Sequence, residues 1–135
     1  MQDRPTIHEL LRSVEQFLRD DVVPATEGRR QFLARVAANA IGLVERELQG
    51  EAEHAAREWD GLDGLLGAEP MPSGRDALAA AVRARNDALC ARIRAGAFDA
   101  ASPARTQLLA HVRTTVRDKL LVTNRAWLEA DGDLG

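Results

Sequence analysis

Cysteine and long apolar runs are scarce in this sequence. Cys90 is the only cysteine, which excludes a disulfide within the chain, and its place beside Leu89 on an apolar face predicts a small core residue. The longest uncharged stretch rich in apolar residues, residues 36–44, is far shorter than the roughly 18 residues of a membrane-spanning helix. The sequence therefore predicts no membrane partner.

The N-terminal segment, Met-Gln-Asp-Arg-Pro, is polar and charged. A secretory signal peptide would carry an apolar segment of about 7–15 residues there. Because the sequence has none, we expect a protein that is not exported and that works in the reducing environment of the cytoplasm.

Length and composition are those of an ordinary globular protein. The chain has 135 residues, of which 45% are hydrophobic and 29% charged, and its formal net charge is -3. A chain of this length commonly folds around one core, so we expect a single domain over residues 1–135. Because the chain is net acidic and lacks a dense stripe of Lys and Arg, we expect no nucleic-acid partner.

Local motifs mark where helices begin and end. Thr6 followed by Glu9 is a capping box, in which each side chain bonds the backbone N–H of the other. Ser102, which a proline follows, is a second N-cap. Between them, Ser73 is the N-cap expected for a third helix, and Gly96 is the left-handed cap expected at its end.

Apolar residues recur at intervals of three and four in five segments, which is the period of amphipathic helices. The second segment is the most apolar, and we expect its stripe to be core. Its alanines and Gly42 would allow a neighbouring helix to approach closely. Trp59 and Trp127 are expected to anchor the core. The five stripes are Ile7, Leu10, Leu11, Val14, Phe17 and Leu18; Phe32, Leu33, Val36, Ala37, Ala40, Ile41, Val44 and Leu48; Ala52, Ala55, Ala56, Trp59, Leu62 and Leu66; Leu78, Val82, Leu89, Cys90 and Ile93; and Leu108, Leu109, Val112, Val116 and Leu120.

These segments predict an all-α fold, because no stretch alternates with period two for long enough to form a strand. Short connections favour antiparallel neighbours. We therefore expect a single-domain antiparallel bundle of four to five helices, with a frayed C-terminal tail at about residues 129–135. Gly50 lies between the second and third segments, and the sequence leaves open whether one helix continues through it.

Catalytic and metal-binding motifs are absent. Glu51 and His54 match Glu-x-x-His, a spacing that di-iron bundles use twice, but it occurs here once. There is neither a Gly-x-Ser-x-Gly nucleophile motif nor a glycine-rich phosphate loop. We therefore expect no catalytic residue, no metal and no cofactor, and an enzyme is the least favoured of the functions that remain.

Polar side chains beside the apolar stripes are the remaining site candidates. Asn39 and Asn86 lie next to predicted core positions, where buried amides must find hydrogen-bond partners. They would either bond to neighbouring groups and fix helix register, or form a ligand site with Arg35 and Arg94. In that site the two guanidinium groups would hold an anionic acyl or phosphate group.

Five segments spread over nearly the whole chain carry a resemblance. They are Asp3-Arg-Pro-Thr6, Arg35-Val-Ala-Ala-Asn39-Ala, Val44-Glu-Arg-Glu-Leu48, Ile93-Arg-Ala-Gly96 and Lys119-Leu-Leu-Val-Thr-Asn124. Together they resemble a small bacterial domain family of unknown function, whose genes tend to stand beside aminoglycoside-phosphotransferase-like kinases and acyl-CoA dehydrogenases. The resemblance implies that a small helical protein of this kind is a partner of those enzymes.

Two functions follow as expectations. The first is a non-catalytic accessory or regulatory protein that binds a kinase-like or acyl-CoA dehydrogenase-like partner enzyme. The alternative is a small-ligand-binding helical bundle that recognises an anionic acyl or phosphate ligand at Arg35, Asn39, Asn86 and Arg94. An exposed apolar patch would favour the first function, and an enclosed pocket lined by those four residues would favour the second.

The second apolar segment also predicts self-association. Its apolar arc is wider than one neighbouring helix covers, so a second copy could bury the remainder in a two-fold homodimer, with Phe32 or Leu43 in the contact. Val36 lies in the middle of the same stripe, so Val36→Asp is expected to unfold the protein, because the carboxylate would be buried without a partner.

Overall fold

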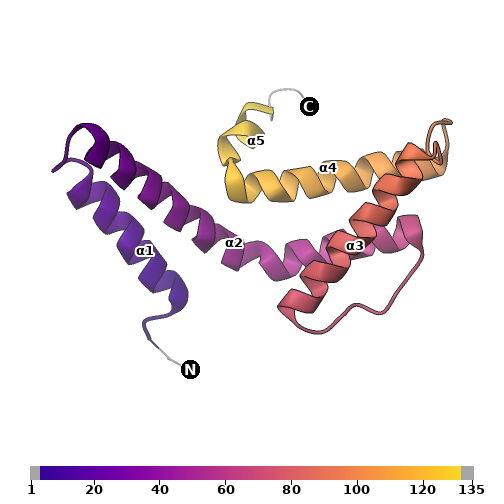
Figure 1. Ribbon diagram of the computed structural model, residues 1–135, viewed down its shortest axis with the longest axis horizontal. Helices are drawn as coiled ribbons and strands as arrows, with labels where there is room; N and C mark the ends of the chain where they lie inside the picture. Colours follow the sequence, from indigo (N-terminus) through magenta and orange to yellow (C-terminus); the bar gives the residue numbers. More distant parts are fainter. Residues whose placement is uncertain (1–3, 132–135) are drawn as a thin grey trace. The chain divides into compact units, whose positions relative to one another are not determined.

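The described protein is built from helices. The computed structural model describes residues 4–131, and that part of the chain contains five α-helices, one π-helical turn and no strand. The α-helices are α1 (Ile7–Phe17), α2 (Gly28–Leu66), α3 (Arg75–Arg94), α4 (Pro103–Thr123) and α5 (Arg125–Asp131), and the π-helical turn (Leu18–Val22) directly follows α1 (Figure 1). Helix accounts for 80% of the structure. The all-α prediction is confirmed.

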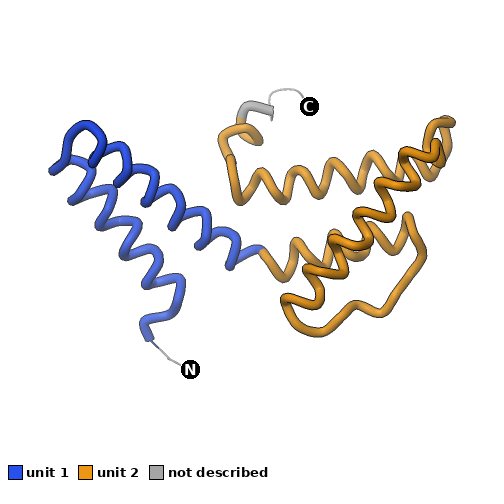
Figure 2. The backbone as a smooth tube through the Cα atoms, in the orientation of Figure 1, with its two compact units in different colours: residues 1–50 blue, residues 51–135 orange. Residues whose placement is uncertain are grey.

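The chain divides into two compact units, Met1–Gly50 (unit 1) and Glu51–Gly135 (unit 2), shown in different colours in Figure 2. The boundary falls inside α2, which continues without a break through Gly50. The second and third apolar segments therefore belong to one helix, which answers the question that the sequence left open. The single-domain organisation stays a prediction.

Capping motifs set the first residues of α1 and α4, as predicted. The backbone N–H of Glu9 donates to the Thr6 hydroxyl at 3.2 Å, and the N–H of Thr6 donates to the Glu9 carboxylate at 2.7 Å. At α4, the N–H of Arg105 donates to the Ser102 hydroxyl at 3.2 Å. Each cap satisfies backbone donors that the helix itself leaves free.

The ends of α3 and α5 agree with the sequence only in part. The N-cap of α3 is Gly74, whose φ of +93° favours glycine, instead of the predicted Ser73. Gly96, with φ +79°, follows the end of α3 as predicted, and its N–H donates to the carbonyl of Ile93 at 3.0 Å. The predicted frayed tail begins inside α5, and its last part, residues 132–135, lies outside the described residues.

Small residues of α2 face α1 in unit 1. Ala34, Ala38 and Gly42 are buried, and they lie one turn apart along α2. A Cβ at Gly42 would come within 2.7 Å of a carboxylate oxygen of Glu15 on α1. The absence of a side chain at Gly42 therefore leaves room for the Glu15 carboxylate of α1.

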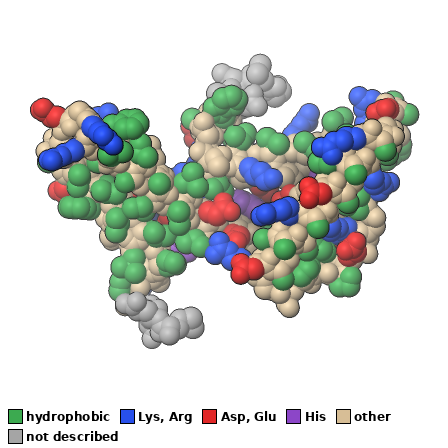
Figure 3. Space-filling model, viewed as in Figure 1, with side chains coloured by type: hydrophobic (Ala, Val, Ile, Leu, Met, Phe, Trp, Pro, Cys, Tyr) green, Lys and Arg blue, Asp and Glu red, His purple; other side chains and the backbone are tan. Residues whose placement is uncertain are grey.

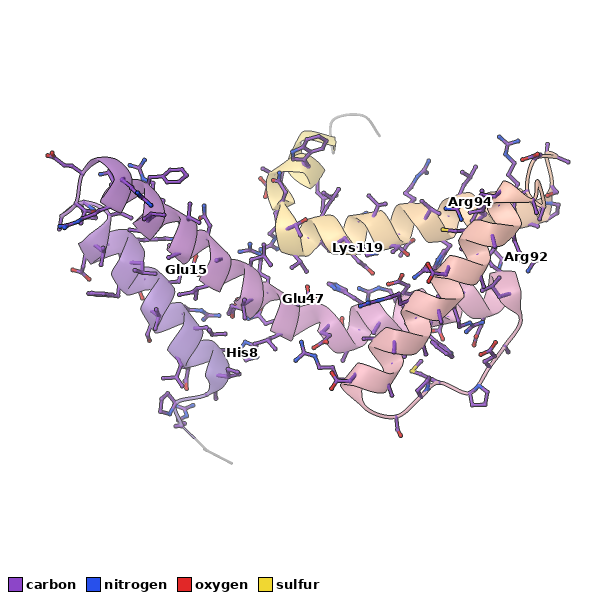
Figure 4. All side chains as sticks on the ribbon, in the orientation of Figure 1. His8, Glu15, Glu47, Arg92, Arg94 and Lys119 are labelled. Atoms are coloured by element: carbon purple, nitrogen blue, oxygen red, sulfur yellow. The ribbon has the colours of Figure 1, made fainter. Side chains whose placement is uncertain are left out.

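Glu45 is the polar centre of unit 1. Its buried carboxylate lies 3.1 Å from the Arg12 guanidinium and 3.6 Å from Nδ1 of His8, both on α1. The Gln49 amide donates to the same carboxylate. Figure 4 labels His8 near the start of α1. These contacts join α1 to α2 and give the buried charge its partners.

Most large apolar side chains of the two stripes in unit 1 are exposed, so the prediction that these stripes form a core is wrong for this structure. Phe32 is 63% exposed and Val36 is 46% exposed. The contact with α1 uses the small-residue side of α2, and the bulky side of the helix points away from it. The exposed set is Ile7, Leu10, Val14 and Phe17 on α1, and Phe32, Leu33, Val36, Leu43 and Val44 on α2.

Unit 2 has an apolar core formed by the second half of α2 together with α3 and α4. Leu62 is fully buried, and Trp59 is buried as predicted. Phe98, in the turn after α3, joins the cluster. The cluster consists of Leu62, Leu65, Leu89, Phe98 and Leu108, with Leu66 and Val82 packed against it. Because its members come from all three helices, this cluster stabilises unit 2.

Several predicted core residues of unit 2 lie at the surface instead. Cys90 is exposed on α3, and Trp127 on α5 is 67% exposed. On α4, the buried residues are Leu108, His111 and Val122, whereas Leu109, Val112 and Val116 are exposed. Adjacent helix positions differ by about 100° around the axis, so the face of α4 that packs on the core lies next to the face that the sequence predicts.

Gly61→Ala is expected to destabilise the protein, and Gly64→Ala is its control. A Cβ at Gly61 would lie only 2.1 Å from Nδ1 of His111. Because the ring is buried, it can make room only by disturbing its neighbours. A Cβ at Gly64 would meet only the amide end of the exposed Gln107, which can swing into solvent. Overpacking should lower the free energy of unfolding of G61A by about 1–3 kcal/mol.

The control should behave in the opposite way. Alanine is a better helix former than glycine by about 1 kcal/mol, so G64A should be as stable as the wild type or more stable. Urea denaturation of the three proteins measures both effects. Equal stability of the two variants would mean that His111 does not pack on Gly61.

Candidate functional site

The four predicted ligand residues fall into two pairs, one in each unit. Arg35 and Asn39 lie one turn apart on α2 and are both exposed, and the Arg19 guanidinium donates to the Asn39 side-chain oxygen at 3.0 Å. Asn86 is half-buried on α3 and donates to the Glu58 carboxylate at 2.7 Å. Both amides therefore bond a side chain of a neighbouring helix, one of the two roles that the sequence leaves open.

Arg94 lies in the last turn of α3 (Figure 4). Its positive charge interacts favourably there with the negative end of the helix dipole. Its neighbour Arg92 has a different role, because its guanidinium donates to the carbonyl of Leu65 at 2.7 Å and lies over the ring of Phe98 at 5.7 Å. Arg92 thus ties the end of α3 to α2. Arg94 stays exposed at the surface.

The Glu and His of the Glu-x-x-His pair of α2 lie beside different groups. The Glu51 carboxylate lies 2.5 Å from Nε of Arg75, and Nε2 of His54 lies 4.0 Å from the Asp118 carboxylate on α4. Within residues 4–131, no three His, Cys, Asp or Glu side chains come together as a metal-binding group. Glu51 therefore contacts α3, whereas His54 lies near α4.

A polar cluster joins α2 to α4 beside the apolar core of unit 2. The Arg57 guanidinium makes two hydrogen bonds to the Asp118 carboxylate, at 3.0 and 3.2 Å. These bonds raise the pKa of Arg57 above its ordinary value. Paired charges of this kind hold two helices relative to each other.

His111 is the titratable group of unit 2 with a distinctive environment. It is 9% exposed, on the face of α4 that packs against Gly61 of α2. Burial lowers the pKa of His111 below its ordinary value of 6.5, the Glu58 carboxylate opposes this shift, and the Lys119 ammonium reinforces it. The ring is therefore neutral in the folded protein at neutral pH.

Protonation of His111 is expected to weaken the fold in mild acid. The unfolded chain binds this proton near pH 6.5, whereas the folded protein binds it only at a lower pH. As the pH falls through the interval between the two pKa values, the unfolded state gains the proton first, so the free energy of unfolding decreases. Below both values the loss is complete.

Thermal melts of the wild type and His111→Gln from about pH 7.5 to about pH 5 measure this effect. The glutamine keeps a polar side chain but does not titrate. The melting temperature of the wild type should fall more steeply with acid than that of H111Q. Parallel slopes would show that His111 titrates normally.

Unit 2 also buries a charged side chain, Arg85, which the sequence did not indicate as a candidate. Arg85 on α3 is 6% exposed, pairs with the Asp63 carboxylate of α2, and stacks 4.5 Å above the ring of Trp59. It also donates to the carbonyl of Gly67 at 2.6 Å. One feature of the sequence indicates that this arginine is buried: it lies between the apolar positions 82 and 89, on the buried side of α3.

A shallow, open depression runs along α3. Its lining comes from α3 alone and consists of Asp76, Ala79, Ala80, Arg83, Ala84 and Asp87. It contains none of the four predicted ligand residues. Because one helix face cannot enclose a small molecule, this depression is not a ligand pocket of the usual kind.

Exposed apolar side chains form rows on several of the described helices. The residues Ile7, Leu10, Val14 and Phe17 form a row on α1, and Leu109, Val112 and Val116 form a row on α4, here named the α4 row. Large apolar residues also cover the outer side of α2 in unit 1, and Figure 3 shows hydrophobic side chains gathered over α1 and the first half of α2. Contiguous exposed apolar side chains mark interaction surfaces in soluble proteins.

Comparison with known proteins identifies the matching part of the chain. Residues 24–125 match a family described as Domain of unknown function (DUF6285). The matched range contains α2, α3 and α4, but not α1. No curated protein and no solved structure matches the chain. None of the described helices is long and apolar enough to cross a bilayer.

Proposed function

The chain belongs to the DUF6285 family, and we propose that it is a non-catalytic accessory protein that binds a partner enzyme through exposed apolar side chains. One observation carries the proposal: in residues 4–131, fifteen large hydrophobic side chains are exposed, and only nine hydrophobic residues are buried. A protein that functions alone would gain stability by burying such side chains.

The α4 row is the surface that we assign to the partner enzyme. It lies within the residues that match the family, whereas the apolar row of α1 lies outside them. Val112 and Val116 are four residues apart and share one side of α4, so they present a continuous apolar strip of the kind that fits a helical groove.

The partner in this proposal is a kinase-like or an acyl-CoA dehydrogenase-like enzyme of a bacterial cytoplasm. The family resemblance supports this choice, because such enzymes are the expected products of neighbouring genes. The polar groups of unit 2 also support a role without catalysis, since Arg57, Asn86 and Arg85 are each bonded to a side chain of another helix.

Size-exclusion chromatography of purified mixtures tests the proposal. The wild-type chain is mixed with a purified aminoglycoside-phosphotransferase-like kinase, or with a purified acyl-CoA dehydrogenase, each taken from a gene beside that of the protein. We expect the wild type to co-elute with one of the two enzymes and Val112→Asp to elute alone. Thr114→Asp places the same charge on an exposed site on the other side of α4 and should still co-elute.

Two results would contradict the proposal. In the first, the wild type co-elutes with neither enzyme. In the second, V112D binds the enzyme as well as T114D does, which would place the contact elsewhere than the α4 row.

A further inference from the structure

The outer side of α2 carries a regular stripe, here named the α2 stripe. Its members are Arg29, Leu33, Val36, Ala40, Leu43 and Glu47, and all six are exposed. Successive members are four, three, four, three and four residues apart, which keeps them on one side of the helix. That side lies opposite the buried residues Ala34 and Ala38, which face α1.

We propose that the α2 stripe binds the α2 stripe of a second copy of this chain, with the two helices antiparallel about a two-fold axis. The spacing of the stripe reads the same in both directions. Reversing one copy therefore places Leu33 opposite Leu43 of the other copy and Val36 opposite Ala40. Phe32 and Val44 flank the stripe on its two opposite edges. An isologous contact needs this self-complementary pattern.

The charges at the ends of the stripe support a second copy as the occupant. Arg29 lies at one end and Glu47, labelled in Figure 4, lies at the other. Antiparallel pairing brings each Arg29 against Glu47 of the other copy, twice per dimer, whereas parallel pairing would oppose like charges. The stripe is thus complementary to itself in one orientation only.

No interaction within the described chain accounts for these two charges. No ion pair or hydrogen bond of Arg29 or Glu47 is found among residues 4–131. Arg29 also lies in the first turn of α2, where the helix dipole favours acidic side chains. A partner carboxylate on a second copy explains an arginine at that place.

Charge reversal tests both the occupant and the register. Sedimentation equilibrium should find the wild type as a dimer at micromolar concentration. Arg29→Glu and Glu47→Arg should each weaken dimerisation by about tenfold or more, because each creates two like-charge contacts. The double variant R29E/E47R restores both pairs with reversed sign and should return the dissociation constant to near the wild-type value.

Arg30→Glu is the matched control. It makes the same change of charge in the same turn, but Arg30 points about 100° away around the helix, so the dissociation constant should stay near that of the wild type. Far-UV circular dichroism of every variant should equal that of the wild type, because all three residues are exposed.

A monomeric wild type, or a double variant as weak as the single ones, would overturn this inference. It goes beyond the proposed enzyme binding, which uses the α4 row. The two can therefore fail separately: a monomer that still co-elutes with an enzyme contradicts only the dimer, and a dimer that binds neither enzyme contradicts only the proposed function.

Discussion

Arg85→Met is expected to lower the free energy of unfolding of the protein by about 3 kcal/mol. The arginine is almost fully buried, and its guanidinium is held by the Asp63 carboxylate, the carbonyl of Gly67 and the face of Trp59. Methionine keeps the length of the side chain but removes the charge and every donor. The Asp63 side chain is 25% exposed and can be partly hydrated, which sets the expected loss at the lower end for a broken buried pair.

The same variant should loosen the connection between α2 and α3. Asp63 and Trp59 both bond the backbone of Glu69, through its N–H and its carbonyl at 3.3 Å each. Arg85 therefore supports two of the side chains that hold this segment. Hydrogen exchange of the amides of residues 67–69 should become faster in R85M, because a segment with fewer bonds opens more often.

A double variant separates the charge from the packing. R85M/D63N removes both ionic partners, so no unpaired buried charge remains, and it should recover part of the stability that R85M loses. Urea denaturation of the wild type, the single variants and the double variant gives the coupling between the two residues. A change of less than about 0.5 kcal/mol for R85M would show that the pair contributes nothing to the fold.

Local signals in the sequence predict the helices and several of their ends. Thr6 and Ser102 cap their helices because a hydroxyl and a backbone N–H three residues later meet by geometry alone. Gly96 ends α3 because glycine adopts positive φ at little cost. Such signals need no knowledge of the rest of the protein.

The buried face of each helix could not be predicted in the same way. Apolar spacing shows which residues of α2 share a side, but it does not show which side meets a neighbour. In unit 1 the small residues Ala34 and Ala38 are buried, and the bulky Val36 is exposed. Small side chains let two helix backbones approach, and this close approach competes with the burial of large side chains.

The sequence indicates which polar side chains need partners, but not which groups those partners are. It predicts that the Asn86 amide needs a hydrogen-bond partner, but not that the partner is Glu58 of another helix. The pairing of Arg85 with Asp63 joins residues far apart in the sequence, so no spacing rule reveals it. The roles proposed for the α4 row and the α2 stripe depend on exposure, which only the three-dimensional structure gives.

Because Val36 is exposed, the sequence-based prediction that Val36→Asp unfolds the protein is replaced: the variant is expected to abolish self-association and leave the fold intact. Val36 is 46% exposed at the middle of the α2 stripe, so a carboxylate there is hydrated in the single chain. In the proposed dimer, the carboxylate of each copy would be buried against Ala40 of the other copy, without a partner, on both sides of the two-fold axis. Burying an unpaired carboxylate costs several kcal/mol, which is enough to dissociate a dimer held by a small interface.

The central claim for unit 1 is that the exposed apolar side chains of the α2 stripe join two copies of the chain. Sedimentation velocity of the wild type and V36D at micromolar and tenfold higher concentration, with far-UV circular dichroism of the same samples, tests this claim. The account predicts a wild type of twice 14.7 kDa and a helical V36D of 14.7 kDa. A wild type that stays at 14.7 kDa at both concentrations, or a V36D that loses its helical signal, would contradict it.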